Sequence, residues 1–202
     1  MMQLLSALAS PYGRKVKITA ALKGVADQIE SKSVDTLPLV NEELRRENPL
    51  SKIPVLILED GTQIFDSHVI CEYLDSLRPD PRLFPAAGPE RFRTLTLAAL
   101  ADGILDAALL LVYEKRYRPE DKWVDTWMQR QQLKIDTALE WLERAPPEMG
   151  PHPDYGHVTL ACALGYLDFR HGGVWRAAHP KLVAWLDAFD KAVPAFAETR
   201  PN

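Results

Sequence analysis

Three short clusters in the first third of the chain carry residue types that could do chemistry together. The first cluster is Ser10-Pro11-Tyr12. Ser is favoured at a helix N-cap and Pro at the first helical position, so this pair predicts a helix start whatever else it does. A helix N-terminus presents free N–H groups and a positive dipole end, which lower the pKa of a thiol held there. No His or Lys stands at a spacing that could activate Ser10 as a nucleophile, so we expect its hydroxyl to donate to a thiolate that a ligand brings.

The second cluster runs from Asn48 to Pro54. Base rates favour a trans bond before Pro54, because cis bonds occupy only about 5–6% of X–Pro positions in folded proteins. With a cis bond, the backbone N–H and C=O of Ile53 could pair with a bound peptide as an added strand does. Lys52 offers a positive charge for a carboxylate, although a lysine in this setting is more often simply exposed to solvent.

The third cluster is Asp66-Ser67, at the start of another predicted helix. An N-cap is a sufficient explanation for this pair. In a functional interpretation, the N–H and hydroxyl of Ser67 would bind a carboxylate and Asp66 would bind an ammonium group. Together the three clusters offer a thiolate site, a backbone edge, an anion site and a zwitterion site, which are the groups that a short acidic thiol peptide needs.

The first 78 residues predict the element order β-α-β-α-β-β-α. We expect strands at residues 2–6, near 29, at 54–58 and at 62–65, and helices at 10–22, at 37–44 and at 69–77 with one apolar stripe of Val69, Ile70, Tyr73, Leu74 and Leu77. The β-α-β opening requires a right-handed crossover and parallel pairing, while Asp60-Gly61 predicts a tight antiparallel hairpin with positive φ at both residues. The result is an α/β domain with a mixed four-stranded sheet.

The rest of the chain predicts an all-α helical bundle. Proline and glycine are dense between residues 79 and 89, which marks a linker between a domain at 1–78 and a domain at 90–202. We expect helices at 92–117, at 123–142 with Trp127, Ile135, Ala138 and Leu142 on one face, at 158–169, and around 182–189. The segment 158–169 is apolar nearly all round, as in a helix at the centre of a bundle.

Composition narrows the function classes. The formal net charge is −4, which argues against a nucleic-acid surface built on charge alone. We expect no apolar run to approach the roughly 18 residues that a membrane-spanning helix needs, and we expect no secretory signal at the N-terminus. Cys71 and Cys162 lie outside any CxxC pair among apolar neighbours, so we expect them to be buried in a cytoplasmic protein. The five histidines are scattered, and we expect no metal site.

The three clusters resemble the glutathione-binding motifs of the glutathione transferase family, in order and in spacing. The resemblance rests on Ser10-Pro11-Tyr12, Lys52-Ile53-Pro54-Val55 and Asp66-Ser67, and on the proline-rich linker before a helical second half. It covers nearly the whole chain and looks closest to bacterial members with serine at the catalytic position. It implies a thioredoxin-like first domain, a cis bond before Pro54 and a two-fold homodimer.

The resemblance also implies a role for each residue. Ser10 would contact the glutathione sulfur, and the backbone of Ile53, with Pro54 behind it, would pair with the cysteinyl unit. Lys52 would lie near the glycyl carboxylate, and Asp66-Ser67 would hold the γ-glutamyl end. The partner subunit would add Asp102 or Asp106, between which the sequence does not choose.

The implied activity is the transfer of an alkyl or aryl group to glutathione, with detoxification as its purpose and a small, apolar electrophile as second substrate. A glutathione-dependent isomerase or dehalogenase, and a non-catalytic glutathione-binding or regulatory protein, are the alternatives. Tyr113, Arg116 and Tyr117 either line an acceptor pocket or form a solvated helix face.

One position departs from the family pattern. The family's buried helix usually begins with Ser or Thr, followed three residues later by Asp; here Asp154 and His157 occupy these positions. We expect His157 to be structural and, because it replaces the reciprocating carboxylate, we expect His157→Asp to be neutral or stabilising.

Overall fold

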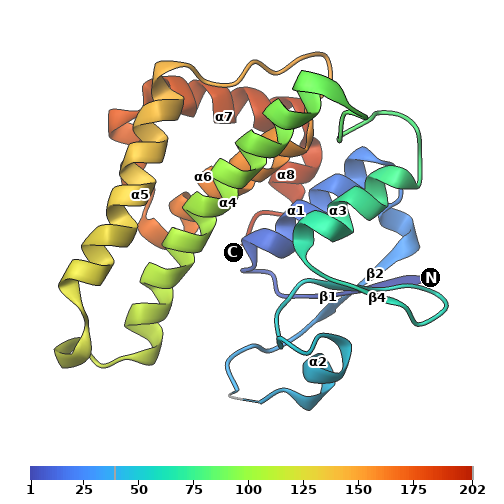
Figure 1. Ribbon diagram of the computed structural model, residues 1–202, viewed down its shortest axis with the longest axis horizontal. Coiled ribbons are helices and arrows are strands. Elements are labelled where there is room, and N and C mark those ends of the chain that lie inside the picture. Colours follow the sequence, from blue (N-terminus) through green and yellow to red (C-terminus); the bar gives the residue numbers. More distant parts are fainter. Residues whose placement is uncertain (39, 202) are drawn as a thin grey trace. The chain divides into compact units, whose positions relative to one another are not determined.

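The strand expected at residues 2–6 forms β1 (Met2–Ser6), in the middle of a four-stranded sheet in the computed structural model (Figure 1). The structure describes residues 1–38 and 40–201. β1 pairs in parallel with β2 (Ile29–Ser33) and antiparallel with β3 (Val55–Ile57), which pairs antiparallel with β4 (Gln63–Ile64). The strand order β2-β1-β3-β4 confirms the mixed, thioredoxin-like sheet that was expected.

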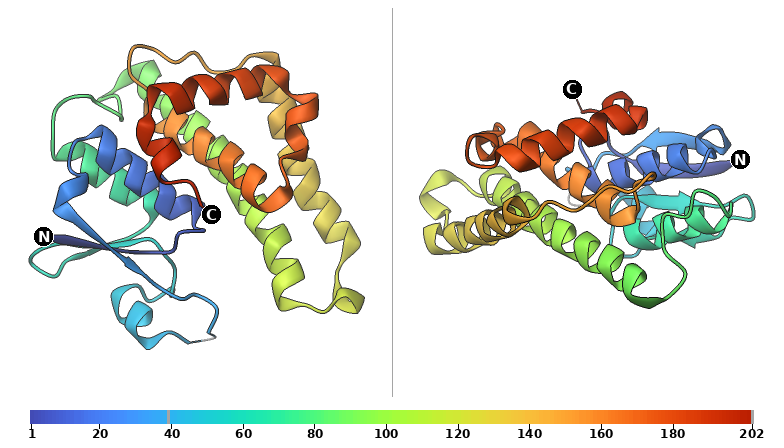
Figure 2. Two further views of the ribbon diagram at one scale, coloured as in Figure 1. Left: turned by 180° about the vertical axis from the view of Figure 1, so that it is seen from behind. Right: turned by 90° about the horizontal axis from the view of Figure 1, so that it is seen from above.

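Helices cover both faces of this sheet. α1 (Pro11–Leu22) and α3 (Ser67–Ser76) lie side by side on one face, and the short α2 (Glu42–Glu47) lies against the other (Figures 1 and 2). Leu44 of α2 packs with Leu5, Val34 and Val55 in a small apolar cluster. The helix expected at residues 37–44 is therefore formed by the charged run at 42–47. Residue 39 of the expected helix lies outside the described residues.

A glycine lets α1 approach the sheet closely. A Cβ on Gly13 would stand 1.9 Å from Oγ and 3.1 Å from Cβ of the buried Ser6 at the end of β1. Even if the Ser6 hydroxyl rotated away, the contact with its Cβ would be tighter than ordinary van der Waals packing, so a glycine here lets the helix start lie close to the strand end. Gly13 thus fixes the position of the first cluster.

Two local expectations were wrong. Of Asp60 and Gly61 only Gly61 has positive φ, at 86°, because the Asp60 carboxylate accepts the Thr62 N–H and stabilises a longer turn. On α3, the inward residues are Ile70, Cys71 and Leu74, whereas Val69 and Leu77 at the ends of the expected stripe are 49% and 39% exposed. A stripe spread over five residues in nine is wider than the face that one neighbouring layer covers.

Buried polar contacts anchor the proline-rich segment after α3. The Asp75 carboxylate accepts the N–H groups of Leu83 (2.8 Å) and Phe84 (3.1 Å). It also pairs with Nζ of the buried Lys23, 2.9 Å away, which in turn donates to the carbonyl of Pro81. These contacts order the first part of the expected linker, and both Leu83 and Phe84 are buried.

The second unit is helical, as the fold prediction required. Its main helices are α4 (Gly88–Tyr117), α5 (Asp125–Arg144), α6 (Tyr155–His171) and α7 (Pro180–Ala192), with short 3₁₀ turns at Glu120–Lys122 and Val174–Ala178. Most of α6 is buried, which confirms its expected central place. Ile135, Ala138 and Leu142 face inward on α5, but Trp127 is 42% exposed.

The long helix α4 meets a criterion for membrane-spanning helices that no part of the sequence was expected to meet. By length and composition it is apolar enough to cross a membrane, with a mean hydropathy of 2.0 over 18 residues. Within its unit, however, α4 packs against α5 and α6 and buries Ala98, Ala101 and Leu105. The core helix of a globular domain has the same composition, so the apolar window does not by itself indicate a membrane segment.

The chain returns to the first unit at its end. Residues 1–85 together with 193–202 form one unit, and residues 86–192 form the other. The tail contains α8 (Pro194–Glu198), whose buried Phe196 packs against α1. The sequence had placed residues 193–202 with the helical domain. Their contacts are instead made with residues nearly two hundred positions earlier, which local patterning does not reveal.

Candidate functional site

Ser10 caps the N-terminus of α1. Its Oγ accepts the N–H of Gly13 at 3.1 Å, and its own N–H donates to the carbonyl of Ala7. A hydroxyl has one donor and two acceptor positions, so this capping bond leaves the Ser10 O–H free to donate elsewhere. The side chain is partly exposed, at the positive end of a twelve-residue helix. The site can therefore hold an anion and supply it with a hydroxyl donor.

The second cluster stands at the same end of the sheet. The Ile53–Pro54 bond is cis, as the resemblance implied and the base rate did not. The antiparallel register places Val55 opposite Leu5, so Pro54 is level with Ser6, at the strand end that leads to Ser10. Pro54 is buried, Ile53 is partly exposed and Lys52 is exposed, so the loop before β3 stays accessible from solvent at this end of the sheet.

A buried asparagine braces this loop, and sequence reasoning missed its role. The Asn48 side chain is 2% exposed; its Oδ1 accepts the Leu50 N–H at 3.0 Å and its Nδ2 donates to the Lys52 carbonyl at 2.9 Å. Its carbonyl also accepts the N–H of Ser51, the one non-glycine residue with positive φ in the described chain. An Asn at a helix end before a Pro is a signal that could have found it, since Asn side chains bond the backbone two residues on.

The third cluster joins the other two through the hairpin. Ile64 pairs with Leu56, so Asp66 is level with Pro54. Asp66 caps α3: its Oδ1 accepts the His68 N–H at 2.7 Å, and the Ser67 hydroxyl points to the same oxygen at 3.5 Å. Ser67 is buried and Asp66 is exposed, and the peptide bond before Asp66 is cis. The fold therefore brings all three predicted clusters to one end of one sheet.

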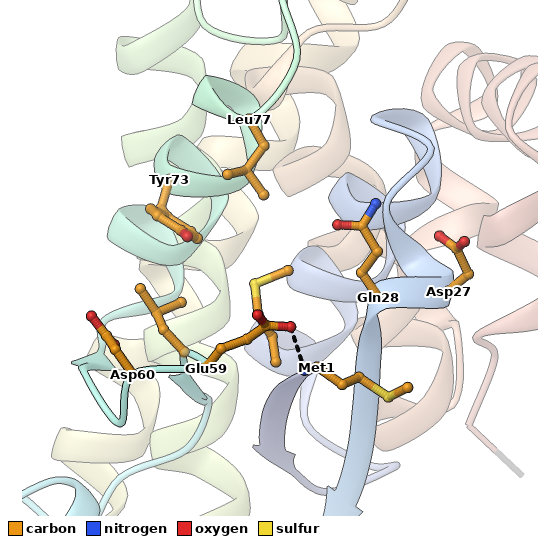
Figure 3. A pocket seen from close by; sticks show the side chains of 9 residues that line it. Met1, Asp27, Gln28, Glu59, Asp60, Tyr73 and Leu77 are labelled. Atoms are coloured by element: carbon orange, nitrogen blue, oxygen red, sulfur yellow. Dashed lines mark hydrogen bonds and ion pairs between the residues drawn. The ribbon is translucent and has the colours of Figure 1, made fainter.

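The opposite end of the sheet holds a separate cavity of about 680 Å³, drawn in Figure 3. Met2, Leu58, Tyr73 and Leu77 contribute to its wall, and none of the predicted site residues lines it. The ammonium group of Met1 donates to Glu59 and holds the pKa of that carboxyl below its ordinary value. Nothing in the residues of this cavity matches the chemistry of the three clusters.

The remaining candidates are placed as follows. Cys71 and Cys162 are buried, as expected. Within the described ranges, no group of three or more His, Cys, Asp or Glu side chains is arranged to hold a metal ion. On α4, Asp102 is partly exposed and Asp106 is exposed, and the rings of Tyr113 and Tyr117 meet edge to face at 5.3 Å.

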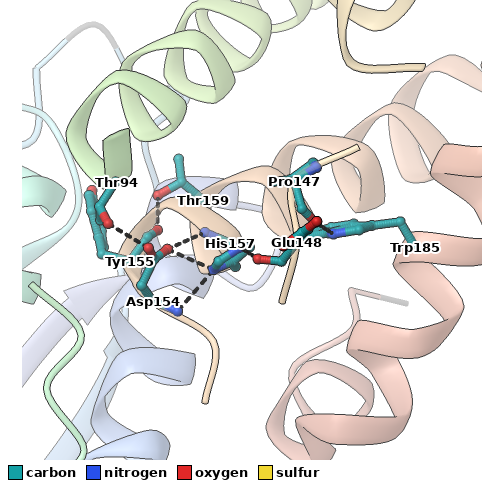
Figure 4. A network of polar contacts seen from close by, with 8 residues as sticks. All are labelled: Thr94, Pro147, Glu148, Asp154, Tyr155, His157, Thr159 and Trp185. Atoms are coloured by element: carbon teal, nitrogen blue, oxygen red, sulfur yellow. Dashed lines mark hydrogen bonds and ion pairs between the residues drawn. The ribbon is translucent and has the colours of Figure 1, made fainter. Parts of the chain in front are cut away.

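His157 does reciprocate the cap of α6, contrary to expectation (Figure 4). Its N–H donates to Asp154 Oδ1 and its Nδ1 accepts the Asp154 N–H, both at 3.0 Å. With the proton on Nε2, the ring also donates to the Glu148 carbonyl at 3.0 Å, and it stacks on Trp185. Nδ1 lies 2.8 Å from Oδ1 as well, so a protonated ring would form an ion pair in the same place.

Asp154 is therefore held as a carboxylate. Burial alone would raise its pKa, but hydrogen bonds from His157 and from the Thr94 hydroxyl outweigh that effect and lower the pKa below its ordinary value. The network ties α4 to the start of α6. The polar groups of these residues bond to one another, so we assign the residues a structural role.

Two models of one protein family match this chain. Residues 9–77 match the family model for the glutathione S-transferase N-terminal domain, and residues 125–188 match that for the C-terminal domain. The uncharacterized GST-like protein YibF of Escherichia coli is 33% identical over 99% of this chain and 98% of its own length.

Two solved structures of a glutathione transferase family member from Pseudomonas fluorescens align with this chain over the full length of both proteins. One, with bound glutathione, has 40% identity and a TM-score of 0.95. The other, with bound S-(propanoic acid)-glutathione, has 39% identity and a TM-score of 0.91.

Proposed function

Because the chain belongs to the glutathione S-transferase family, we propose that it binds glutathione at the sheet end formed by the three clusters and transfers small electrophiles to the glutathione sulfur. The observation that carries this proposal is the register of the sheet. It makes Pro54 level with Ser6 and with Asp66, so the start of α1, the Ile53 backbone and the start of α3 converge.

Each part of glutathione has a matching group. Ser10 donates to the sulfur, and the Ile53 backbone, held by cis-Pro54, pairs with the cysteinyl unit. Asp66 takes the ammonium group of the γ-glutamyl end, and Ser67 takes its carboxylate. The exposed ammonium of Lys52 binds the glycyl carboxylate, and Asn48 fixes the backbone beside it.

The chemistry then consists of ionising and positioning a thiol. The helix N-terminus and the Ser10 hydroxyl both favour the charged form of the sulfur, so the thiol loses its proton to solvent near neutral pH. The thiolate bonds to the electrophilic carbon while the electron pair of the bond that breaks leaves with the displaced group or moves into a neighbouring carbonyl. Positioning supplies the rest of the acceleration.

Further features belong to the same proposal. We expect a cytoplasmic homodimer that needs no metal and binds neither nucleic acid nor membrane, and in which Asp102 or Asp106 of the partner's α4 helps to hold glutathione. The bound S-(propanoic acid)-glutathione of the Pseudomonas relative is a thioether, the type of product that transfer makes, and it favours a transferase over a glutathione-dependent isomerase.

The test separates the two functions of Ser10, capping the helix and donating a hydrogen bond to the sulfur. Ser10→Ala removes both the cap and the donor, whereas Ser10→Gly removes the donor but costs the cap only a few tenths of a kcal/mol. We expect both variants to raise the pKa of bound glutathione by about one unit, measured by ultraviolet absorbance of the thiolate, and only Ser10→Ala to melt clearly lower.

Calorimetric titration with glutathione supplies the control. Binding without turnover of any electrophile would point to the non-catalytic alternative, and absence of binding would refute the assignment of the site. A thiolate titration that is the same in wild type and both variants would remove Ser10 from the mechanism.

A further inference from the structure

The cavity at the end of the sheet opposite the three clusters has an apolar wall that no other element covers (Figure 3). All of its lining residues belong to the first unit, and they come from α3, the β3–β4 hairpin, the start of β1 and the 3₁₀ turn Ala26–Gln28. Tyr73 and Leu77 line it from α3, and Leu77 is 39% exposed although the sequence placed it on a buried stripe. An exposed apolar face inside a cavity is suited to an apolar ligand.

Buried contacts behind the cavity hold this wall in place. Asp75 lies between Tyr73 and Leu77 on α3 and pairs with the ammonium group of Lys23 at 2.9 Å. The same ammonium group donates to the carbonyls of Arg78 at 2.7 Å and of Pro81 at 2.6 Å, so it offers no charge to a ligand in the cavity. The cavity volume of about 680 Å³ falls in the range of small-molecule pockets, about 300–1,000 Å³.

The charged groups that line the cavity are mostly negative. They are the carboxylates of Asp27, Glu59 and Asp60 and the ammonium group of Met1. The Met1 ammonium is bonded to Glu59 and compensates its charge. The N–H and hydroxyl of Thr62 hold the pKa of Asp60 below its ordinary value, so this carboxylate is charged at neutral pH. Asp27 and Asp60 therefore leave the cavity with an uncompensated negative potential.

Polar groups of the cavity are also available for bonding. Among residues 1–38 and 40–201, no partner is found for the Asp27 carboxylate, the Gln28 side-chain amide or the Tyr73 hydroxyl. Each of these groups has an oxygen that can accept an N–H. Apolar walls with a few such polar groups are the usual composition of a small-molecule site.

We propose that this cavity binds a small organic cation, a primary amine carried on an aromatic body. The aromatic body lies against Leu58, Leu77 and the ring of Tyr73, which offer it apolar surface. The ammonium group pairs with the carboxylates of Asp27 and Asp60, whose charge no cation of the cavity compensates. The site is separate from the proposed glutathione site, and the inference does not depend on the proposed function.

The test compares two probes that differ in one charge, 2-phenylethylamine and 2-phenylethanol. Calorimetry gives the Kd of each, and the measured quantity is the Kd of the alcohol divided by the Kd of the amine, which cancels the contribution of the ring. We expect a ratio of about ten in the wild type, since each of two exposed charge contacts contributes about a factor of three. A ratio of one, or no binding of either probe at about 10 mM, would overturn the proposal.

Asp27→Asn tests the charge contact, and Glu30→Gln is its matched control. Asp27→Asn removes a carboxylate from the cavity without breaking a bond to another described residue, and it should lower the ratio about threefold. Glu30 is exposed on β2 in the same unit but does not line the cavity, so its variant removes the same charge and should keep the wild-type ratio. Equal ratios in the two variants would refute a direct contact with Asp27.

Leu77→Ser tests the apolar wall, with Val69→Ser as control. Leu77→Ser should weaken the binding of both probes about fivefold, because it removes apolar contact area from the cavity. Val69 is another exposed apolar residue of α3, 49% exposed, and it does not line the cavity, so its variant should bind both probes as the wild type does. Equal affinities in the two variants would show that the probes bind elsewhere and would overturn the proposal.

A titration in the presence of glutathione distinguishes the cavity from the three clusters. The cavity shares no residue with the clusters, so saturating glutathione should leave the Kd of 2-phenylethylamine unchanged. Competition between the amine and glutathione would place the amine at the three clusters and refute the cavity site. If glutathione itself does not bind, the proposed function fails, while the four variants still test the cavity.

Discussion

His157 shows how one residue can satisfy a structural rule by an unexpected route. A capping box needs a side chain three residues after the cap that accepts the cap's N–H, and Glu or Gln usually provides it. Imidazole Nδ1 provides it here, and the second ring nitrogen reaches the Glu148 carbonyl, which a shorter carboxylate could not do. From sequence, His157 was expected only to cost the helix its reciprocating carboxylate, whereas in the structure it reciprocates the cap and extends it to a further loop.

We accordingly expect His157→Asp to be destabilising, the reverse of the expectation from sequence. The variant loses the bond to Glu148 and the stack on Trp185, and it places a second carboxylate beside Asp154. The free energy of unfolding in urea at neutral pH should fall by about 1–3 kcal/mol. His157→Gln, which keeps a capping-box acceptor and adds no charge, should lose less. An unchanged or higher unfolding free energy for His157→Asp would show that the ring contacts contribute nothing.

The residues of the candidate site divide by the range of the interactions that define them. Ser10 and Asp66 could be found from sequence, because an N-cap is a local pattern of a few residues. The cis bond before Pro54 came from the family resemblance, since local statistics favour trans. The support that Arg14 gives to the start of α1 could not be found from sequence, because its guanidinium donates to the Phe196 carbonyl, 182 positions later in the chain.

At the scale of elements, periodicity predicted which helices and strands exist better than how each one packs. α6 was correctly expected to be central, because an apolar surface all round leaves a helix no other place. The ends of the α3 stripe were misplaced, since the width of a buried face depends on the neighbouring elements and not on the helix alone. Close approaches that need glycine are set in the same way, by the partner element.

Two helical glycines of the second unit give a matched test of this point. A Cβ on Gly156 would stand 2.8 Å from the Thr94 carbonyl oxygen, where α6 meets α4, whereas a Cβ on Gly103 would meet nothing within 4 Å. Gly103→Ala should raise the free energy of unfolding by about 0.5–1 kcal/mol through helix propensity. Gly156→Ala should lower it by about 1–3 kcal/mol, because a backbone atom cannot move aside cheaply. Both free energies of unfolding are measured by denaturant titration. A higher free energy of unfolding for Gly156→Ala would mean that α4 and α6 pack less closely than described.

At the scale of the whole molecule, the chain builds its first unit from both of its ends. Residues 193–202 return after the helical unit, and Phe196, 3% exposed, lies under the guanidinium of Arg14, 3.9 Å from its ring centre. Arg14 is in the first turns of α1, four residues after Ser10. The tail therefore supports the very helix start that the proposed function places beside the glutathione sulfur.

We expect Phe196→Ala to lower the free energy of unfolding by about 3 kcal/mol, through lost burial and the lost contact with Arg14. Hydrogen exchange should quicken in the amides of α1, because the helix loses its support on that side. Glu198→Ala is the control on the same short helix: its side chain is exposed, so both measurements should match wild type. If α1 exchanges equally slowly in both variants, the tail only covers the first unit, and the helix start that carries Ser10 is held by the sheet and Gly13 alone.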